Sequence, residues 1–78
     1  MSSVTSFHDF WFGLSAKSRT TYAQKVGTSE GYMEKVASGN AAPSLGMLAR
    51  MVEADRRVRF EGVLATWRAG QARRGKCH

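Results

Sequence analysis

The sequence has a single cysteine, a single proline and no long run of apolar residues. One cysteine, Cys77, cannot form an intrachain disulfide, so a reducing cytoplasm is the simplest setting. The longest apolar runs are too short to span a bilayer, which requires about 20 apolar residues. The first residues, MSSVTSFHDF, lack the basic start and apolar stretch of a secretory signal peptide. We therefore expect a cytoplasmic protein with no membrane partner.

Acidic residues are scarce in the last third of the chain. Residues 1–55 carry five basic and five acidic side chains, whereas residues 56–78 carry seven basic side chains against Glu61 alone. This excess of six accounts for the whole formal net charge of +6. A block of this kind favours a polyanionic partner, either nucleic acid or an acidic protein surface. The alternative is a solvated tail that keeps a small protein soluble.

Residues suited to catalysis or metal binding are few. His8 lies far along the chain from Cys77 and His78, so the three do not have the spacing of metal ligands. No pair of carboxylates adjoins an apolar cleft, as acid–base catalysis would require. A chain of 78 residues is also too small to enclose a large substrate. We therefore expect no enzyme activity, no metal, no cofactor and no small-molecule substrate.

Apolar residues recur at the spacing of amphipathic α-helices through most of the chain. Serine or threonine caps precede the first, third and fourth of these segments, and glycine follows the second and third. They and the spacing predict helices at about residues 7–14, 17 or 18–26, 30–37, 45–52 and 60–68. The residues expected to face inward are Phe7, Phe10, Trp11, Leu14, Tyr22, Ala23, Val26, Met33, Val36, Ala37, Leu45, Leu48, Ala49, Val52, Phe60, Val63, Leu64 and Trp67.

The fifth segment has a second interpretation, because residues 57–61 also alternate polar and apolar as an edge strand does. The later spacing of Val63, Leu64 and Trp67 favours a helix, and no second strand is available to pair with it. The sequence therefore predicts an all-α fold, a compact bundle of four to five short helices. We expect one domain over residues 1–68 and a basic, flexible tail over residues 69–78.

The junction between the second and third predicted helices is short and contains Gly27. A helix that ends at this glycine, followed two residues later by another, must cross it at a steep angle. The small Ala23 lets the two backbones approach, and Val26, Met33 and Val36 fill the wedge between them. This arrangement is typical of the helix-turn-helix, whose second helix enters the major groove of DNA. The alternative is an ordinary helical hairpin.

The segment RTTYAQKVGTSEGYMEKVASGNAAPSLGMLARMVE, residues 19–53, resembles the λ-repressor-like, Cro-type helix-turn-helix domain of phages and bacteria. Small Cro- and YdaS-like regulators show the same order of glycine turn, serine-capped recognition helix, ASG break and PS-initiated helix. The resemblance covers residues 6–67. It implies a λ-repressor-like fold and a DNA-binding transcriptional regulator of phage or prophage origin. Such a repressor occupies an operator on double-stranded DNA, usually as a homodimer, in the nucleoid of a bacterial cell.

The resemblance also implies positions for DNA contacts. Base-edge contacts fall at the start and outer face of the third helix, on Ser29, Glu30, Gly31, Glu34 and Lys35. Phosphate or backbone contacts fall on Arg19, Thr20, Thr28, Tyr32, Ser38 and Asn40. Lysine can donate to guanine O6 and N7, and glutamate can accept from cytosine N4. Two glutamates facing phosphates also weaken binding, so their role in base contact stays open.

Two further surfaces are candidates for contacts. In the basic block, non-specific phosphate contacts are expected from Arg68, Arg73, Arg74 and Lys76. The apolar stripe Phe60, Val63, Leu64 and Trp67 is the candidate dimer contact, and its alternative role is to close the core of the single chain. A competing function is an interaction protein that binds a host RNA polymerase subunit, a toxin or another regulator. The net-neutral body of the chain favours that alternative.

Overall fold

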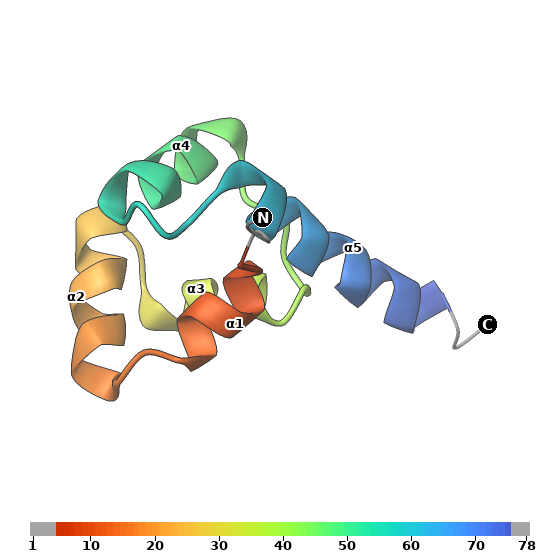
Figure 1. Ribbon diagram of the computed structural model, residues 1–78, viewed down its shortest axis with the longest axis horizontal. Coiled ribbons are helices and arrows are strands. Elements are labelled where there is room, and N and C mark those ends of the chain that lie inside the picture. Colours follow the sequence, from red (N-terminus) through yellow and green to blue (C-terminus); the bar gives the residue numbers. More distant parts are fainter. Residues whose placement is uncertain (1–4, 76–78) are drawn as a thin grey trace.

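The computed structural model describes residues 5–75, with side chains as far as Arg73. Within this range the chain forms five α-helices and no strand (Figure 1). They are α1 (Phe7–Phe12), α2 (Ala16–Val26), α3 (Glu30–Ala37), α4 (Leu45–Ala54) and α5 (Phe60–Gly75). The prediction of an all-α bundle is confirmed. The strand interpretation of residues 57–61 is wrong, because a turn and an irregular segment lead into α5, which begins at Phe60.

Serine caps start the first four helices. In each case a serine in extended conformation precedes the helix, and its hydroxyl accepts a hydrogen bond from a backbone N–H three residues on. These caps are Ser6, Ser15, Ser29 and Ser44. Each one satisfies an N–H group that has no partner within its helix, which is why the helices begin where they do. The helix α2 begins at Ala16, before the predicted start at Lys17 or Ser18, because Ser15 is its cap.

Gly27 ends α2 and sets the direction of the chain into α3. Its backbone is left-handed, with φ 88° and ψ 34°, and its N–H donates to the carbonyls of Ala23 and Gln24. A residue with a side chain rarely adopts this conformation, whereas glycine does so at little cost. The predicted glycine turn between two helices is therefore confirmed.

The core lies between α1, α2 and α3, with contributions from α4 and α5. Its largest fully buried side chains are Trp11, Phe7, Met33, Met51, Val26 and Val36. The rings of Phe7 and Trp11 pack around Tyr22, with centroids 6.2 and 6.4 Å from its ring. The Tyr22 hydroxyl donates to the Met51 carbonyl oxygen at 2.8 Å and so ties α2 to α4. Burial raises the pKa of this hydroxyl, which keeps it protonated as a donor.

The inward face of α4 differs from the prediction. Leu45 and Ala49 were expected to face inward, but both are exposed; Leu48 is buried as expected, and Met51 is buried in addition. The reason is that α4 packs mainly on α2, so only one narrow edge of the helix is covered. Leu45, 79% exposed, is left on the surface.

The helix α5 also differs from the prediction, because it continues past Arg68 to Gly75. Contacts with the end of α3 hold this extension. Gly70 packs backbone against backbone on Gly39, and the Arg73 Nη2 donates to the Ser38 carbonyl oxygen at 2.8 Å. Residues 69–75, which were expected to form a flexible tail, are therefore helical, and residues 76–78 lie outside the described range. Figure 1 shows the end of α5 projecting from the bundle.

Candidate nucleic-acid interface

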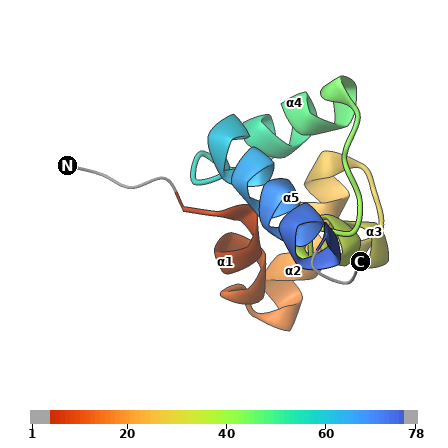
Figure 2. The same cartoon turned by 90° about the vertical axis from the view of Figure 1, so that its right-hand side faces the viewer.

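The helix α3 has one buried and one exposed face. Met33, Val36 and Ala37 are buried against α1, α2 and α5. The side facing away from these helices is exposed, and it carries Glu30, Gly31, Glu34 and Lys35. Figure 2 shows α3 on the opposite side of the molecule from the segment that joins α4 to α5. A helix that is buried on all sides cannot contact a duplex. Because α3 has an exposed face, it can do so.

The start of α3 is organised around Ser29. Its hydroxyl accepts from the Tyr32 N–H at 3.1 Å, and the first N–H groups of a helix have no partner within it. The N-terminal end of α3 therefore presents polarised N–H groups at the surface, where an anion is favoured. A β-carbon added to Gly31 would lie 4.0 Å from the Ser29 Oγ, so packing does not require glycine there.

Thr20 connects α2 to the exposed face of α3. Its hydroxyl lies 2.7 Å from the Glu30 Oε2 and 3.2 Å from the Ala16 carbonyl oxygen. A hydroxyl group has one proton and can donate one strong hydrogen bond at a time. The bond to Glu30 is the stronger of the two, because it is shorter and its acceptor is charged. Thr20 therefore holds the Glu30 carboxylate beside the start of α2.

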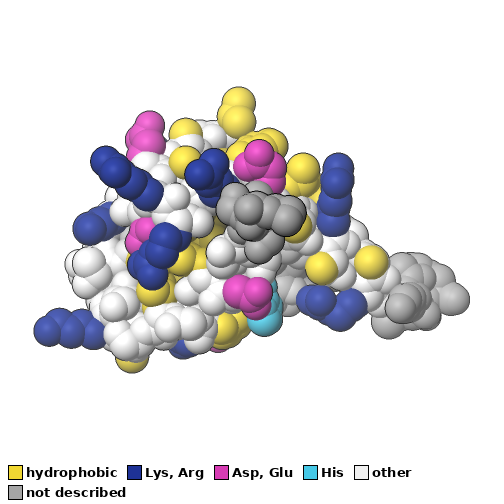
Figure 3. All heavy atoms as spheres, viewed as in Figure 1, with side chains coloured by type: hydrophobic (Ala, Val, Ile, Leu, Met, Phe, Trp, Pro, Cys, Tyr) yellow, Lys and Arg dark blue, Asp and Glu magenta, His cyan; other side chains and the backbone are white. Residues whose placement is uncertain are grey.

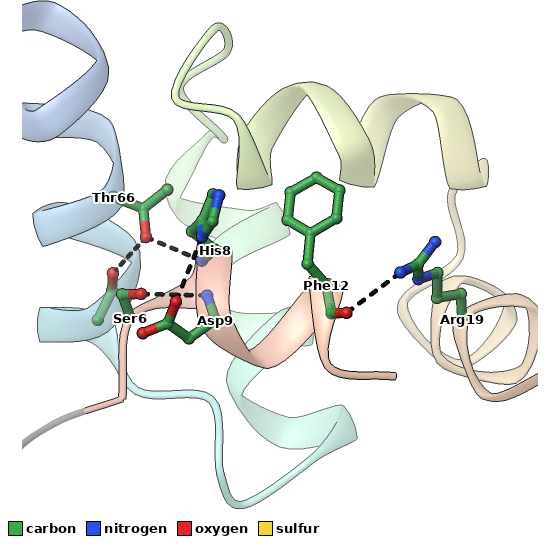
Figure 4. A network of polar contacts seen from close by, with 7 residues as sticks. Ser6, His8, Asp9, Phe12, Arg19 and Thr66 are labelled. Carbon is green, nitrogen blue, oxygen red and sulfur yellow. Dashed lines mark hydrogen bonds and ion pairs between the residues drawn. The ribbon is translucent and has the colours of Figure 1, made fainter. Parts of the chain in front are cut away.

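Arg19 makes contacts within the chain. Its Nε donates to the Trp11 carbonyl oxygen at 3.2 Å and its Nη2 to that of Phe12 at 3.3 Å (Figure 4). The guanidinium also lies 5.7 and 5.5 Å from the centroids of these two rings. It thereby satisfies carbonyl groups at the end of α1, which have no partner inside the helix. A phosphate contact by Arg19 stays a prediction.

The other predicted contact residues on and beside α3 differ in their exposure and in their hydrogen bonds. Thr28 and Tyr32 are half-buried, and Asn40 is exposed. The Ser38 hydroxyl donates to the Glu34 carbonyl oxygen at 2.8 Å. On α5, Arg68 and Arg73 are exposed, and the bond from Arg73 to Ser38 places its guanidinium at the end of α3. The Arg74 side chain and Lys76 lie outside the described part of the chain.

Arg50 was not predicted as a contact residue. It is exposed on α4, and its Nη1 would lie 3.9 Å from a β-carbon added to Gly27. The guanidinium is therefore beside the turn that joins α2 to α3. The helical spacing of α4 leaves Arg50 on an outer face, but no local pattern indicates which neighbouring element its side chain reaches.

The charges on α3 do not by themselves favour DNA. Its exposed face carries Glu30 and Glu34 against Lys35, a net charge of −1. Positive charge must therefore come from neighbouring elements if a duplex is to bind. Arg50 beside the turn and Arg73 at the end of α3 supply it at both ends of the helix.

The predicted dimer contact is partly buried in the single chain. Val63, 3% exposed, belongs to the core, so its assignment to a dimer contact is corrected. Phe60 is 51% exposed, and Leu64 and Trp67 are half-buried. Together with Leu45 these residues line an apolar groove of about 310 Å³ between the start of α4 and α5.

Residues 5–73 contain no group of three or more His, Cys, Asp or Glu side chains that could hold a metal ion. None of the five described helices is long and apolar enough to cross a membrane.

Comparisons with protein-family models, curated proteins and solved structures find no match to this chain. The likeness to Cro-type regulators therefore depends on the motif in residues 19–53. It stays a hypothesis, which the arrangement of α2 and α3 makes open to test.

Proposed function

We propose that this chain is a sequence-specific DNA-binding regulator of transcription, a repressor of the Cro type that places α3 in the major groove. It would occupy an operator and exclude polymerase, with no chemistry of its own. The observation that carries this proposal is the exposed face of α3, which follows a three-residue turn at residues 27–29 and is covered by no other described element.

The dimensions of α3 suit a groove. An α-helix with its side chains is about 10–12 Å across, and the major groove is about 12 Å wide, so α3 fits the groove by its diameter. Lys35 would donate to guanine, and Glu30 or Glu34 would accept from cytosine N4. Ser29 and the N-terminal end of α3 would bind phosphate, with Arg50, Arg68 and Arg73 neutralising the flanking backbone.

Binding to duplex DNA across a salt series tests the proposal. We expect a site selected from a random library to bind at least about a thousandfold more tightly than unrelated sequence at physiological salt. The logarithm of the affinity should also fall linearly with that of the salt concentration. Weak binding with no preference, even at low salt, would reject the proposal.

Replacing Thr20 by valine is expected to relax base preference at one position of the selected site. Valine keeps the shape of threonine but cannot hold the Glu30 carboxylate, so that carboxylate would sample several positions. Discrimination against the wrong base should fall by about 1 kcal/mol, which is roughly fivefold. The matched control is Thr21→Val, because the Thr21 hydroxyl bonds only the Lys17 carbonyl oxygen. Competition binding with single-base variants of the site measures both, and equal effects would contradict the role of Thr20.

We also propose that two copies associate through the apolar groove between α4 and α5. Leu45 and Phe60 are large exposed hydrophobic side chains that border one another there, and two copies related by a twofold axis would cover both. A dimer of this kind would suit a pseudo-palindromic site with half-sites about one helical turn apart.

Phe60→Glu is expected to weaken this dimer at least tenfold without unfolding the chain, because half of the Phe60 surface is already exposed. Analytical ultracentrifugation over a concentration series measures the change. Phe12→Glu is the control, since Phe12 is exposed at 39% but lies outside the groove. Two variants that dissociate alike, or a wild-type chain that stays monomeric at high concentration, would contradict the dimer.

A second candidate function is an interaction protein that binds a polymerase subunit, a toxin or another regulator. The two glutamates on the exposed face of α3 favour it, because they oppose phosphate and would suit a basic partner. The same salt series separates the two functions, since a protein-binding α3 gives no site preference on DNA.

A further inference from the structure

A second surface lies on the side of the molecule away from α3. It is a hollow of about 300 Å³ between α1, α2 and the segment joining α4 to α5. Figure 3 views this side and shows Lys and Arg side chains beside exposed hydrophobic ones over α2 and the adjoining segment. The volume is at the lower end of the range for small-molecule sites.

The floor of the hollow is apolar. Phe10, Leu14 and Tyr22 line it, and the rings of Phe10 and Tyr22 pack edge to face with centroids 5.1 Å apart. Leu14 remains half-buried, so part of its surface is available to a ligand. Such a floor gains free energy when a flat apolar group covers it.

The rim of the hollow carries an excess of positive charge. It contains Lys17, Lys25 and Arg57 against the single carboxylate of Asp55. Arg57 donates two hydrogen bonds to that carboxylate, from Nη2 to Oδ2 at 2.9 Å and from Nε to Oδ1 at 3.1 Å. These hydrogen bonds lower the pKa of Asp55, which therefore stays ionised. Neither lysine forms a salt bridge with another residue of the described chain, so both can take up an anion.

The position of Arg57 is fixed from two sides. Its backbone N–H and its side chain both bond Asp55, and its guanidinium lies 5.0 Å from the centroid of the Phe10 ring. These contacts place the Arg57 guanidinium at one wall of the hollow. Lys17 and Lys25 lie two turns apart on α2, with Thr21 midway between them. Their flexible stems allow both ammonium groups to reach an anion placed beside Thr21.

We propose that this hollow binds an organic anion with a flat apolar body, such as an aromatic carboxylate. The ring covers Leu14 and Tyr22, and the anionic group lies between Lys17 and Lys25. This site does not depend on DNA binding, because it faces away from α3 and shares none of its exposed residues.

Titration of the full chain with naphthoate, followed by amide chemical shifts, tests the inference. We expect saturable shifts centred on Leu14, Thr21 and the segment around Asp55, with a submillimolar dissociation constant. The neutral isostere naphthamide keeps the ring and lacks the charge, whereas the small anion acetate keeps the charge and lacks the ring. Each should bind at least tenfold more weakly than naphthoate.

The double variant Lys17→Gln/Lys25→Gln should weaken naphthoate at least tenfold, while the matched control Lys35→Gln on α3 leaves it unchanged. Both substitutions lie at exposed positions and keep the fold, which the thermal unfolding midpoint verifies. Equal affinity for naphthamide would overturn the inference, as would shifts centred on the Leu45–Phe60 groove. Tighter binding of an acidic peptide at the same residues would also overturn it and assign the surface to a protein partner.

Discussion

Gly70→Ala is expected to destabilise the protein by about 3 kcal/mol. A β-carbon at this position would lie 2.4 Å from the Gly39 carbonyl oxygen and 2.7 Å from the Gly39 Cα. Both are backbone atoms, so no side-chain rotation relieves the overlap, and α5 must move away from the end of α3. Overpacking of this kind costs about 1–3 kcal/mol and sometimes more. Urea unfolding followed by circular dichroism measures the loss.

The matched control is the same substitution at Gly46. This glycine lies inside α4, and a β-carbon added there meets no atom within 4 Å. Gly46→Ala should therefore stabilise the protein by about 0.5–1 kcal/mol, because alanine loses less backbone entropy in a helix. A Gly70→Ala variant as stable as Gly46→Ala would show that α5 does not pack on Gly39 in solution.

Lys35→Glu is expected to lower affinity for the selected duplex about a hundredfold. It removes the one cation on the exposed face of α3 and adds a third carboxylate beside Glu30 and Glu34. The loss combines a base contact worth about 1–3 kcal/mol with added repulsion from the phosphates. Fluorescence anisotropy with labelled duplex at fixed salt measures it.

Lys17→Glu is the control for Lys35→Glu, since it makes the same change of net charge at an exposed position of α2 that lines the hollow beside α1. We expect its loss of affinity to be less than tenfold, because salt largely screens an exposed charge that makes no direct contact with the duplex. Equal losses in the two variants would mean that net charge, rather than the face of α3, determines DNA binding.

Local signals made much of the fold predictable. Ser6 and Ser44 are caps whose side chains bond a backbone N–H three residues away, so their effect is contained in a few neighbouring residues. Gly27 acts in the same local way at the end of α2. The bounds of α3 followed from its cap and the glycine after it, and its buried residues Met33, Val36 and Ala37 followed from the helical spacing.

The features that were missed depend on contacts between distant parts of the chain. The extension of α5 is held by Gly39 and Ser38, which lie some thirty residues earlier in the sequence. The rotation of α4 depends on where α2 meets it, and the periodicity of α4 itself fits more than one buried face.

The candidate site shows the same division between local and distant contacts. The exposed residues of α3 could be predicted, because the helical spacing identifies the buried positions and the remaining ones face solvent. The contacts of Thr20 with Glu30, of Arg19 with the end of α1 and of Arg50 with the turn are tertiary. Sequence spacing does not determine which of several partners such long side chains choose.

Amide chemical shifts of the chain, recorded as a selected duplex is added, test whether α3 is the surface that meets DNA. We predict that the largest changes fall on Glu30, Gly31, Glu34 and Lys35, with smaller ones at Arg50 and Arg73. Changes confined to α5, or no change on α3 at a duplex concentration that saturates binding, would contradict the proposed function.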